Sequence, residues 1–209
     1  MAADPALNSI PAIAAPDSLR SVRVAILATD GFEQAELMEP RKALEAAGAD
    51  TEVISPKQGK IRGWKMKEWG DEVEVDQVLD GADPNDYDAL LLPGGVINAD
   101  ALRMLPKAVK FVKSFFDDGK PVGAICHAPW ALIESGVARG HRMTSWPSLK
   151  TDLTNAGAQW VDEEVVVDGQ LVTSRKPEDI PAFNRQILRL FGEAVRSWTA
   201  SRTGSSHLV

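Results

Sequence analysis

The chain has 209 residues, of which 44% are apolar and 25% are charged, and this composition is typical of a globular protein with one domain. Its net charge of −7 and its pI of about 5.0 exclude a general basic surface, so we expect no nucleic-acid partner and no membrane partner. One cysteine and three histidines exclude a disulfide framework and a thiolate zinc cluster, and we expect no metal and no cofactor.

The two ends of the chain are predicted to be tails. Residues 1–20 are rich in alanine and proline, and they lack the basic start and long apolar run of a secretory signal. No run approaches the ~18 apolar residues of a membrane span. We therefore expect a flexible N-terminal tail at 1–20, a C-terminal tail at 196–209, one domain at 21–195, and a cytoplasmic location.

Strand and helix signals alternate through the first half of the domain. Short β-branched runs predict buried strands, and apolar residues at helical spacing predict a helix that Gly48 ends. The elements expected in order are a strand at 22–28, a helix at 34–47, a strand at 51–55 and small antiparallel strands or a hairpin within 56–78.

The second half continues the alternation and ends in a hairpin, because Asp168-Gly169 is a strong hairpin turn. The elements expected are a strand at 87–92, a helix at 107–117, a strand at 120–125, a helix from Pro129 to near Gly136, a helix around 148–155, strands at 165–167 and 171–174, and a closing helix at 179–191. This order predicts an α/β fold whose mostly parallel central sheet is covered on both faces.

Three groups that could take part in catalysis follow strands of this sheet. Glu33 comes after the first strand, Gly94-Gly95 after a middle strand and Cys126 after the next. Reactive groups of such sheets collect at the carboxyl ends of the strands, so we expect these residues to meet at one site.

Cys126 has the surroundings of a nucleophile on a sharp strand-to-helix turn. Ala124 and Ala128 are small enough to let strand and helix approach, and Pro129 suits the first helical turn. The helix N-terminus would lower the pKa of the thiol. A buried, inert cysteine is the alternative, but the motif favours a reactive thiol.

His127 and the two glycines could complete this site. His127 could serve as base or acid beside the thiol, and the alternative is a histidine that only bonds nearby backbone. The N–H groups of Gly94, Gly95 and His127 could form an oxyanion hole, although Pro-Gly-Gly is also an ordinary turn.

The acidic residues after the first strand leave two interpretations open. The Glu33 carboxyl could hydrogen-bond the Cys126 sulfur and set its protonation. Acidic residues in a first helical turn also complement the helix dipole, which suffices for one of Glu33 and Glu36.

Together these motifs resemble the PfpI family of intracellular cysteine peptidase-like proteins, within the superfamily of the parkinsonism-associated deglycase and class I glutamine amidotransferase-like domains. The resemblance covers about residues 22–191. It rests on Ala28-Thr29-Asp30-Gly31-Phe32-Glu33, Leu91-Leu92-Pro93-Gly94-Gly95, Lys120-Pro121-Val122-Gly123-Ala124-Ile125-Cys126-His127, residues 151–158, 164–169 and 172–175.

The resemblance implies a flavodoxin-like three-layer sandwich and a homodimer or homohexamer. It also implies a Cys-His pair with a glutamate on the sulfur, matching Cys126, His127 and Glu33. A further acidic residue is offered by the neighbouring subunit in that family, and Asp100 is the nearest match in this chain.

Two positions depart from the family pattern near the expected substrate pocket. Ala128 stands where the family usually has glycine, and Trp146 stands where it often has tyrosine. Tryptophan has an N–H donor and no hydroxyl, so an acid–base role of that tyrosine does not carry over.

We expect a cysteine-dependent enzyme of stress responses that acts on small reactive aldehydes, such as methylglyoxal and glyoxal, or on their protein adducts. A peptidase of the same site chemistry is the first alternative. A redox-sensing or chaperone protein that uses Cys126 without turnover is the second. An amidotransferase is disfavoured because no His-x-Glu follows the cysteine, and a Rossmann domain because no GxGxxG follows the first strand.

Overall fold

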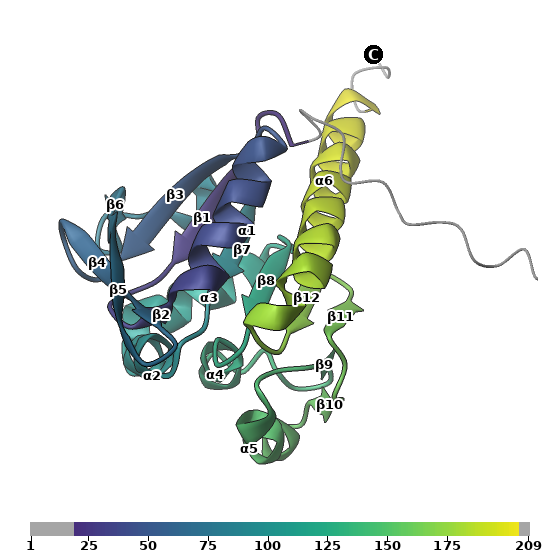
Figure 1. Cartoon of the computed structure of the whole chain (residues 1–209). Helices are drawn as coiled ribbons and strands as arrows, with labels where there is room; N and C mark the ends of the chain where they lie inside the picture. Colours follow the sequence, from purple (N-terminus) through teal and green to yellow (C-terminus); the bar gives the residue numbers. More distant parts are fainter. Residues whose placement is uncertain (1–18, 205–209) are drawn as a thin grey trace, which may run out of the picture.

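The computed structural model describes residues 19–204 of the chain, and the side chains of residues 19–194. A seven-stranded sheet forms its centre, in the order β11-β12-β8-β7-β1-β3-β6 (Figure 1). The strands are β1 (Arg23–Leu27), β3 (Asp50–Ser55), β6 (Gln77–Val78), β7 (Ala89–Leu92), β8 (Val122–Ile125), β11 (Val165–Asp168) and β12 (Leu171–Ser174). Every neighbouring pair is parallel except β11 with β12. The predicted mostly parallel α/β sandwich is confirmed.

Helices cover both faces of this sheet (Figure 1). They are α1 (Gln34–Ala46), α2 (Val96–Arg103), α3 (Pro106–Asp117), α4 (Pro129–Glu134), α5 (Lys150–Asn155) and α6 (Ile180–Gly204). One face packs against α1 and α6, and the other against α3, α4 and α5. In the part of the chain that is described, no helix has the length and apolar character needed to cross a membrane.

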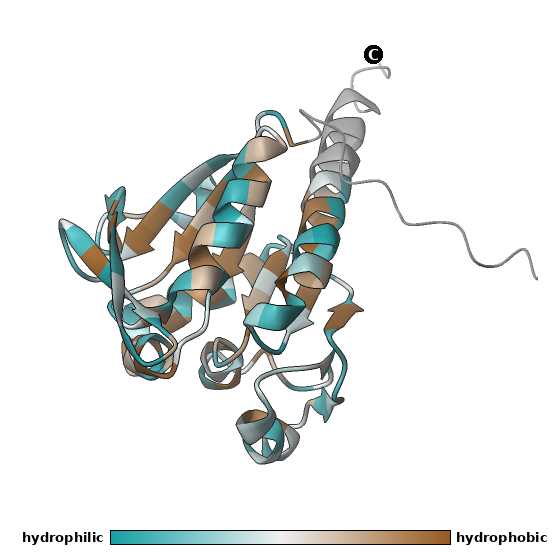
Figure 2. Ribbon diagram, viewed as in Figure 1, coloured by the Kyte–Doolittle hydropathy of each residue, from teal (hydrophilic) through white to brown (hydrophobic). Residues whose placement is uncertain are grey.

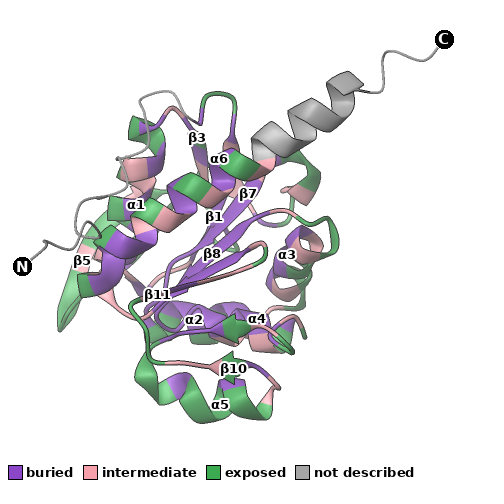
Figure 3. Ribbon diagram, turned by 90° about the vertical axis from the view of Figure 1, so that its right-hand side faces the viewer, coloured by how far each residue is buried: buried purple, intermediate pink, exposed green. Residues whose placement is uncertain are grey.

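The alternation of side chains along the strands produces two separate cores. In β1, Ala25 and Leu27 enter one core, whereas Val24 and Ile26 enter the other, because successive side chains of a strand point to opposite faces. Figure 2 shows the apolar strands enclosed by helices with polar outer sides, and Figure 3 shows the central strands as buried. Both sheet faces are therefore buried, as the near-continuous apolar strands predict.

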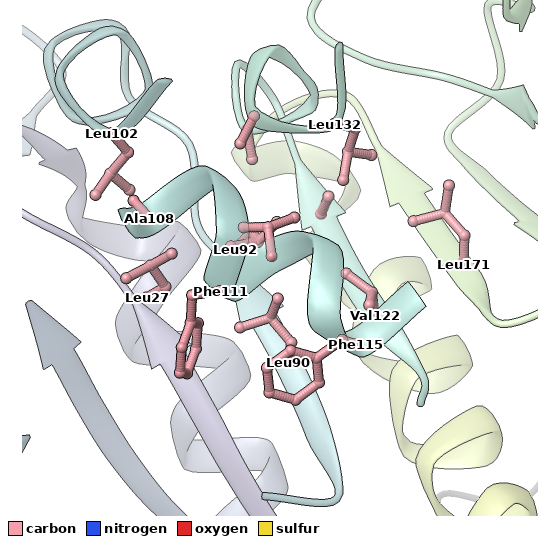
Figure 4. Close-up of a cluster of buried hydrophobic side chains, with 14 of the residues drawn as sticks. Leu27, Leu90, Leu92, Leu102, Ala108, Phe111, Phe115, Val122, Leu132 and Leu171 are labelled. Atoms are coloured by element: carbon pink, nitrogen blue, oxygen red, sulfur yellow. The ribbon is translucent and has the colours of Figure 1, made fainter. Parts of the chain in front are cut away.

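The core beneath α3 contains the larger cluster (Figure 4). Phe111 and Phe115 of α3 pack over Leu90 of β7, and Leu132 of α4 joins them. Phe115 and Leu90 are 0% exposed, so replacing either with alanine would remove about 2–5 kcal/mol of stability. This core fixes the position of α4 and of the turn that precedes it.

Smaller sheets flank the main one. The segment 56–78 contains the hairpin of β4 (Lys60–Lys65) and β5 (Glu68–Glu74), which confirms the predicted small antiparallel strands. β4 also pairs with β2 (Phe32–Glu33). Beyond α4, β9 (Arg142–Met143) pairs with β10 (Gln159–Trp160). The β4–β5 hairpin thereby lies next to the chain that follows β1.

The structure differs from the predicted elements in three places. Helix α2 lies between the predicted strand at 87–92 and the predicted helix at 107–117, where no element was expected. Helix α6 continues to Gly204, beyond the predicted end at 191 and into the expected tail. Leu19 lies within the predicted N-terminal tail, yet it is buried and donates its N–H to Ala47 O at 2.8 Å. The rest of the predicted tails, 1–18 and 205–209, lies outside the described residues.

The chain order creates a natural place for a site. From β1 the chain proceeds outward to β3 and β6, and then returns to β7, β8 and β12 on the other side of β1. The order of the strands reverses between β1 and β7, and ligands of such sheets bind at the carboxyl ends of the strands at this point.

Candidate active site

Cys126 occupies a strained turn directly after β8. Its φ is +63°, in the left-handed region that side chains other than glycine rarely adopt. The turn is held on both sides, because the Cys126 N–H donates to Ser174 O at 3.0 Å and the Cys126 carbonyl accepts the Trp146 N–H at 2.9 Å. The neighbouring strand and loop thus maintain the sharp turn that the sequence predicts.

Close packing around the cysteine requires small residues. A Cβ added to Gly94 would lie 2.6 Å from the Cys126 Cβ, so only glycine fits opposite the thiol. Ala128 is buried in the core with Leu132 and does not line the cavity at the site. Our expectation that Ala128 belongs to the substrate pocket was wrong, because the start of α4 turns this side chain into the α3–α4 layer.

His127 lies beside the thiol as a neutral base. Its Nδ1 is 3.1 Å from the Cys126 sulfur. Its ring stacks on Trp146 with centroids 5.7 Å apart and meets the edge of Trp130 at 5.2 Å. Burial lowers the pKa of His127 to about 4, so the ring is neutral at pH 7 and can accept a proton.

The carboxyl group beside the sulfur belongs to Glu36 and not, as we expected, to Glu33. Glu36 is 0% exposed, accepts the Gly94 N–H at 2.9 Å and hydrogen-bonds the Cys126 thiol. Burial, followed by the charge of Glu33, raises the pKa of Glu36 to about 8. This side chain therefore holds a proton at neutral pH.

Helical spacing explains why Glu36 is the inner residue. Glu36, Pro40 and Leu44 follow one another at every fourth position and are all buried. Glu33 precedes the helix as its N-cap and remains half-buried at the cavity, where burial raises its pKa. The buried stripe of α1 was the signal in the sequence that distinguishes the two acids.

The pKa of the Cys126 thiol is raised rather than lowered. Burial is the largest cause, and the next is the charge that Glu36 carries when it is ionised. The N–H groups of Gly95 and His127 act in the opposite direction as donors to the sulfur. We expected the N-terminus of the next helix to lower this pKa. That helix, α4, has only 6 residues, and burial of the thiol raises its pKa instead.

The backbone donors are divided between two acceptors. The Gly94 N–H is used by Glu36, so it is not free for an oxyanion as we expected. The Gly95 and His127 N–H groups are directed at the sulfur. Gly94 contributes instead by allowing the close approach of its loop to Cys126.

These groups lie at a cavity of about 650 Å³. The β4–β5 hairpin, the start of α2 and the segment after β12 form its walls. Its lining residues are Gly31, Glu33, Glu36, Trp64, Met66, Lys67, Gly95, Val96, Ile97, Cys126, His127, Trp146, Lys176, Pro177 and Glu178. The structure thus brings Cys126, His127, Glu33, Gly95 and Trp146 together.

Asp100 is separate from this group. It is exposed on α2 and does not line the cavity. Glu36 was not predicted as a site residue, and Lys176 was not predicted as part of the wall. The stretch from Ile61 to Trp69 was expected to shape a lid or an interface, and its Trp64 and Met66 do line the cavity. The walls come from a hairpin and a loop that only the tertiary fold brings to Cys126.

Known proteins are similar to this sequence over most of its length. A profile of the DJ-1/PfpI family matches residues 22–190. A deglycase of Thermococcus kodakarensis is 44% identical over 169 residues, which are 81% of this chain and 99% of the relative. Protein/nucleic acid deglycase 2 of Escherichia coli is 44% identical over 173 residues, 82% of this chain and 99% of the relative. General stress protein 18 of Bacillus subtilis is 46% identical over 169 residues, 80% and 96% of the two chains.

Solved structures show the same fold. A two-domain protein of Anabaena variabilis, with DJ-1/ThiJ/PfpI-like and ferritin-like domains, superposes with a TM-score of 0.77 at 35% identity, covering 82% of this chain and 48% of that one. DJ-1beta of Drosophila melanogaster superposes with a TM-score of 0.73 at 27% identity, covering 86% and 98%. The chain belongs to the DJ-1/PfpI family.

Proposed function

We propose that this protein is a cysteine-dependent deglycase that removes glyoxal- and methylglyoxal-derived groups from proteins, and that it also converts the free aldehydes. The observation that carries the proposal is the strained Cys126, with the neutral His127 Nδ1 at 3.1 Å and two N–H donors at the sulfur. Relatives that match nearly over their whole length are named deglycases, which supports this substrate class.

The site suits attack on a carbonyl carbon. His127 accepts the thiol proton, and the sulfur forms a bond to the carbonyl carbon of the aldehyde-derived group. The carbonyl oxygen then carries the negative charge, which the N–H groups of Gly95 and His127 stabilise. The proton on His127 passes to this oxygen, or to the departing amine where the attacked carbon carries one, and leaves a hemithioacetal. A proton shift from the sulfur-bearing carbon to the adjacent carbonyl carbon converts the hemithioacetal into a thioester while the adjacent carbonyl becomes an alcohol. Water then hydrolyses the thioester, which releases the hydroxy acid and the free thiol.

Glu36 keeps the sulfur in a state suited to this cycle. Because its carboxyl is protonated at neutral pH, its O–H can donate to the sulfur when the thiol loses its proton. If Glu36 were ionised, its charge would oppose the thiolate. Protonated Glu36 therefore supplies a donor for the thiolate, and neutral His127 supplies an acceptor for the thiol proton.

A peptidase uses the same sulfur chemistry, and one Bacillus subtilis relative carries a cysteine protease in its name. A redox sensor would also use this sulfur, because oxidation and attack on a carbonyl both require the thiolate form of Cys126. The cavity has Trp64, Trp146 and Met66 among its lining residues, and its volume of about 650 Å³ has room for a modified side chain.

We further propose that the chain assembles with copies of itself. Asp100 is exposed on α2, whose first residues Val96 and Ile97 line the cavity, so a second copy packed on this helix could receive it near its own site. We expect a homodimer or homohexamer on these grounds, and a protein of the cytoplasm. Mass measured in solution tests the assembly.

A substrate comparison tests the proposed function. Purified protein is incubated separately with methylglyoxal, with a methylglyoxal-modified arginine peptide and with the unmodified peptide. We expect consumption of the aldehyde and recovery of the free peptide from its adduct, with no cleavage of the unmodified peptide. Peptide-bond cleavage without adduct removal would favour the peptidase. No reaction with any of the three, together with stable oxidation of Cys126 under peroxide, would favour the sensor.

A further inference from the structure

Asn98 in α2 is fully buried and uses its whole side-chain amide. Its exposed fraction is 0%. Oδ1 accepts the N–H of Thr29 at 2.7 Å, and Nδ2 donates to Pro93 O and to Gly94 O, each at 3.0 Å. The amide therefore ties the loop after β1 to the loop after β7, at the point where the strand order reverses.

The Gly94 carbonyl that Asn98 holds belongs to the same peptide unit as the Gly95 N–H. This peptide is trans and planar, so its C=O and its N–H point in opposite directions. The carbonyl is held by Asn98 Nδ2 at 3.0 Å and by the Glu33 N–H at 3.2 Å. Fixing the carbonyl on one side therefore fixes the direction of the Gly95 N–H on the other, where the sulfur lies.

This peptide has little else in its own sequence to orient it. It joins two glycines, which have the widest backbone freedom of any residues. Gly95 is at φ +86° and is the N-cap of α2, and no side chain caps it. An unheld Gly94–Gly95 peptide could rotate and turn its N–H away from Cys126. The buried amide of Asn98 supplies the shorter of the two hydrogen bonds that restrain this peptide, and the Glu33 N–H supplies the other.

We propose that Asn98 is a positioning residue that aims the Gly95 N–H at the Cys126 sulfur and at the oxyanion formed next to it. Its action on turnover rests on the proposed function, whereas its action on the ionisation of Cys126 does not. Removing the amide removes a well-directed donor from the thiolate, and the same donor from the reacting oxygen.

The test uses Asn98→Leu, which keeps the approximate volume, and Asn98→Ala, with Leu102→Ala as the matched control. Leu102 is also buried on α2, but it belongs to the core beneath α3 and does not line the cavity. The first readout is the rate of Cys126 alkylation by iodoacetamide as a function of pH. The second is the separation of kcat from KM with the modified arginine peptide, and thermal unfolding monitors stability.

For the Asn98 variants we expect the alkylation profile to move to higher pH and kcat to fall by about tenfold or more, with KM changed by less than about threefold. Leu102→Ala should lower the melting temperature and leave the profile in place. The proposal is overturned if folded Asn98 variants keep the wild-type profile, or if Leu102→Ala moves it equally. Failure of both Asn98 variants to fold would also overturn it, because the amide would then hold the fold rather than orient one peptide.

The alkylation and turnover measurements distinguish a failure of the role given to Asn98 from a failure of the proposed function. If the wild-type protein turns over none of the adducts, the proposed function fails, and alkylation still decides the role of Asn98. If the wild type is active and the alkylation profiles coincide, only the inference about Asn98 fails.

Discussion

The Glu36 carboxyl and the Cys126 thiol are hydrogen-bonded to each other in a buried position at the base of the cavity. Each raises the energy of charge on the other, because both would become anions on losing a proton. The pKa of Glu36 is raised to about 8, so its carboxyl is protonated at neutral pH. The carboxyl O–H can then donate a hydrogen bond to the sulfur. The chemistry of the site follows from this shared burial.

Replacing Glu36 with glutamine will let the thiol ionise at lower pH. The substitution keeps the shape and a donor for the sulfur, and it removes the charge that raises the thiol pKa. Cys126 is the only cysteine of the chain, so the ultraviolet absorbance of its thiolate reports one group, with Cys126→Ala as the blank. Glu33→Gln is the matched control and should shift the ionisation less. An unchanged or higher ionisation pH in Glu36→Gln would contradict this account.

The stability of the fold should depend on pH through Glu36. Its pKa rises from an ordinary 4.5 to about 8 on folding, so the folded state binds more protons than the unfolded state within this window. The stabilising contribution is complete below about pH 4.5 and is lost as the pH rises through about 8, by up to about 1.4 kcal/mol per pH unit. Urea unfolding at several pH values should show wild type losing stability relative to Glu36→Gln over this range. Parallel curves would mean that Glu36 is ionised in the folded protein.

Trp146→Ala should move the acidic limb of the pH–activity profile to higher pH. The Trp146 ring stacks on His127, and the burial it provides lowers the His127 pKa to about 4. Exposing the imidazole returns its pKa toward the ordinary 6.5, so the base becomes protonated and inactive in mildly acidic solution. The pH dependence of kcat measures the shift. Trp69→Ala, which removes an exposed ring that packs on Trp64, should leave the limb in place.

Gly95→Ala should cost more stability than Gly140→Ala, although both glycines have nearly the same φ, +86° and +85°. Nothing lies within 4 Å of a Cβ on Gly140, so only the backbone penalty of about 1–2 kcal/mol applies. A Cβ on Gly95 would lie 2.6 Å from Glu33 N, so the loop must move. We expect a larger loss of unfolding free energy and a loss of activity only in Gly95→Ala. Equal losses in the two variants would show that the Gly95 loop tolerates displacement.

The fold and the sharp turn at Cys126 could be predicted from the sequence. Strand and helix periodicity identified nearly all elements of the sheet, and the small residues around Cys126 identified its turn, because both signals are local. Helix α2 was missed because its first turn is capped by Gly95 and its anchor, Asn98, bonds to distant loops. The family resemblance pointed to Glu33, whereas the burial of Glu36 follows from its place in the buried stripe of α1. The cavity walls depend on tertiary contacts that no local pattern carries.

The most direct test of the central claim is the turnover of a methylglyoxal-modified arginine peptide by wild type and Cys126→Ser. Serine retains the size and the turn at φ +63°, and it replaces the sulfur with a far weaker nucleophile. Thermal unfolding establishes that the variant is folded, and Gly140→Ala serves as a control away from the cavity. We predict that wild type and Gly140→Ala release the free peptide and that Cys126→Ser releases none above the uncatalysed rate. Wild-type release by folded Cys126→Ser would contradict the assignment of Cys126 as the nucleophile.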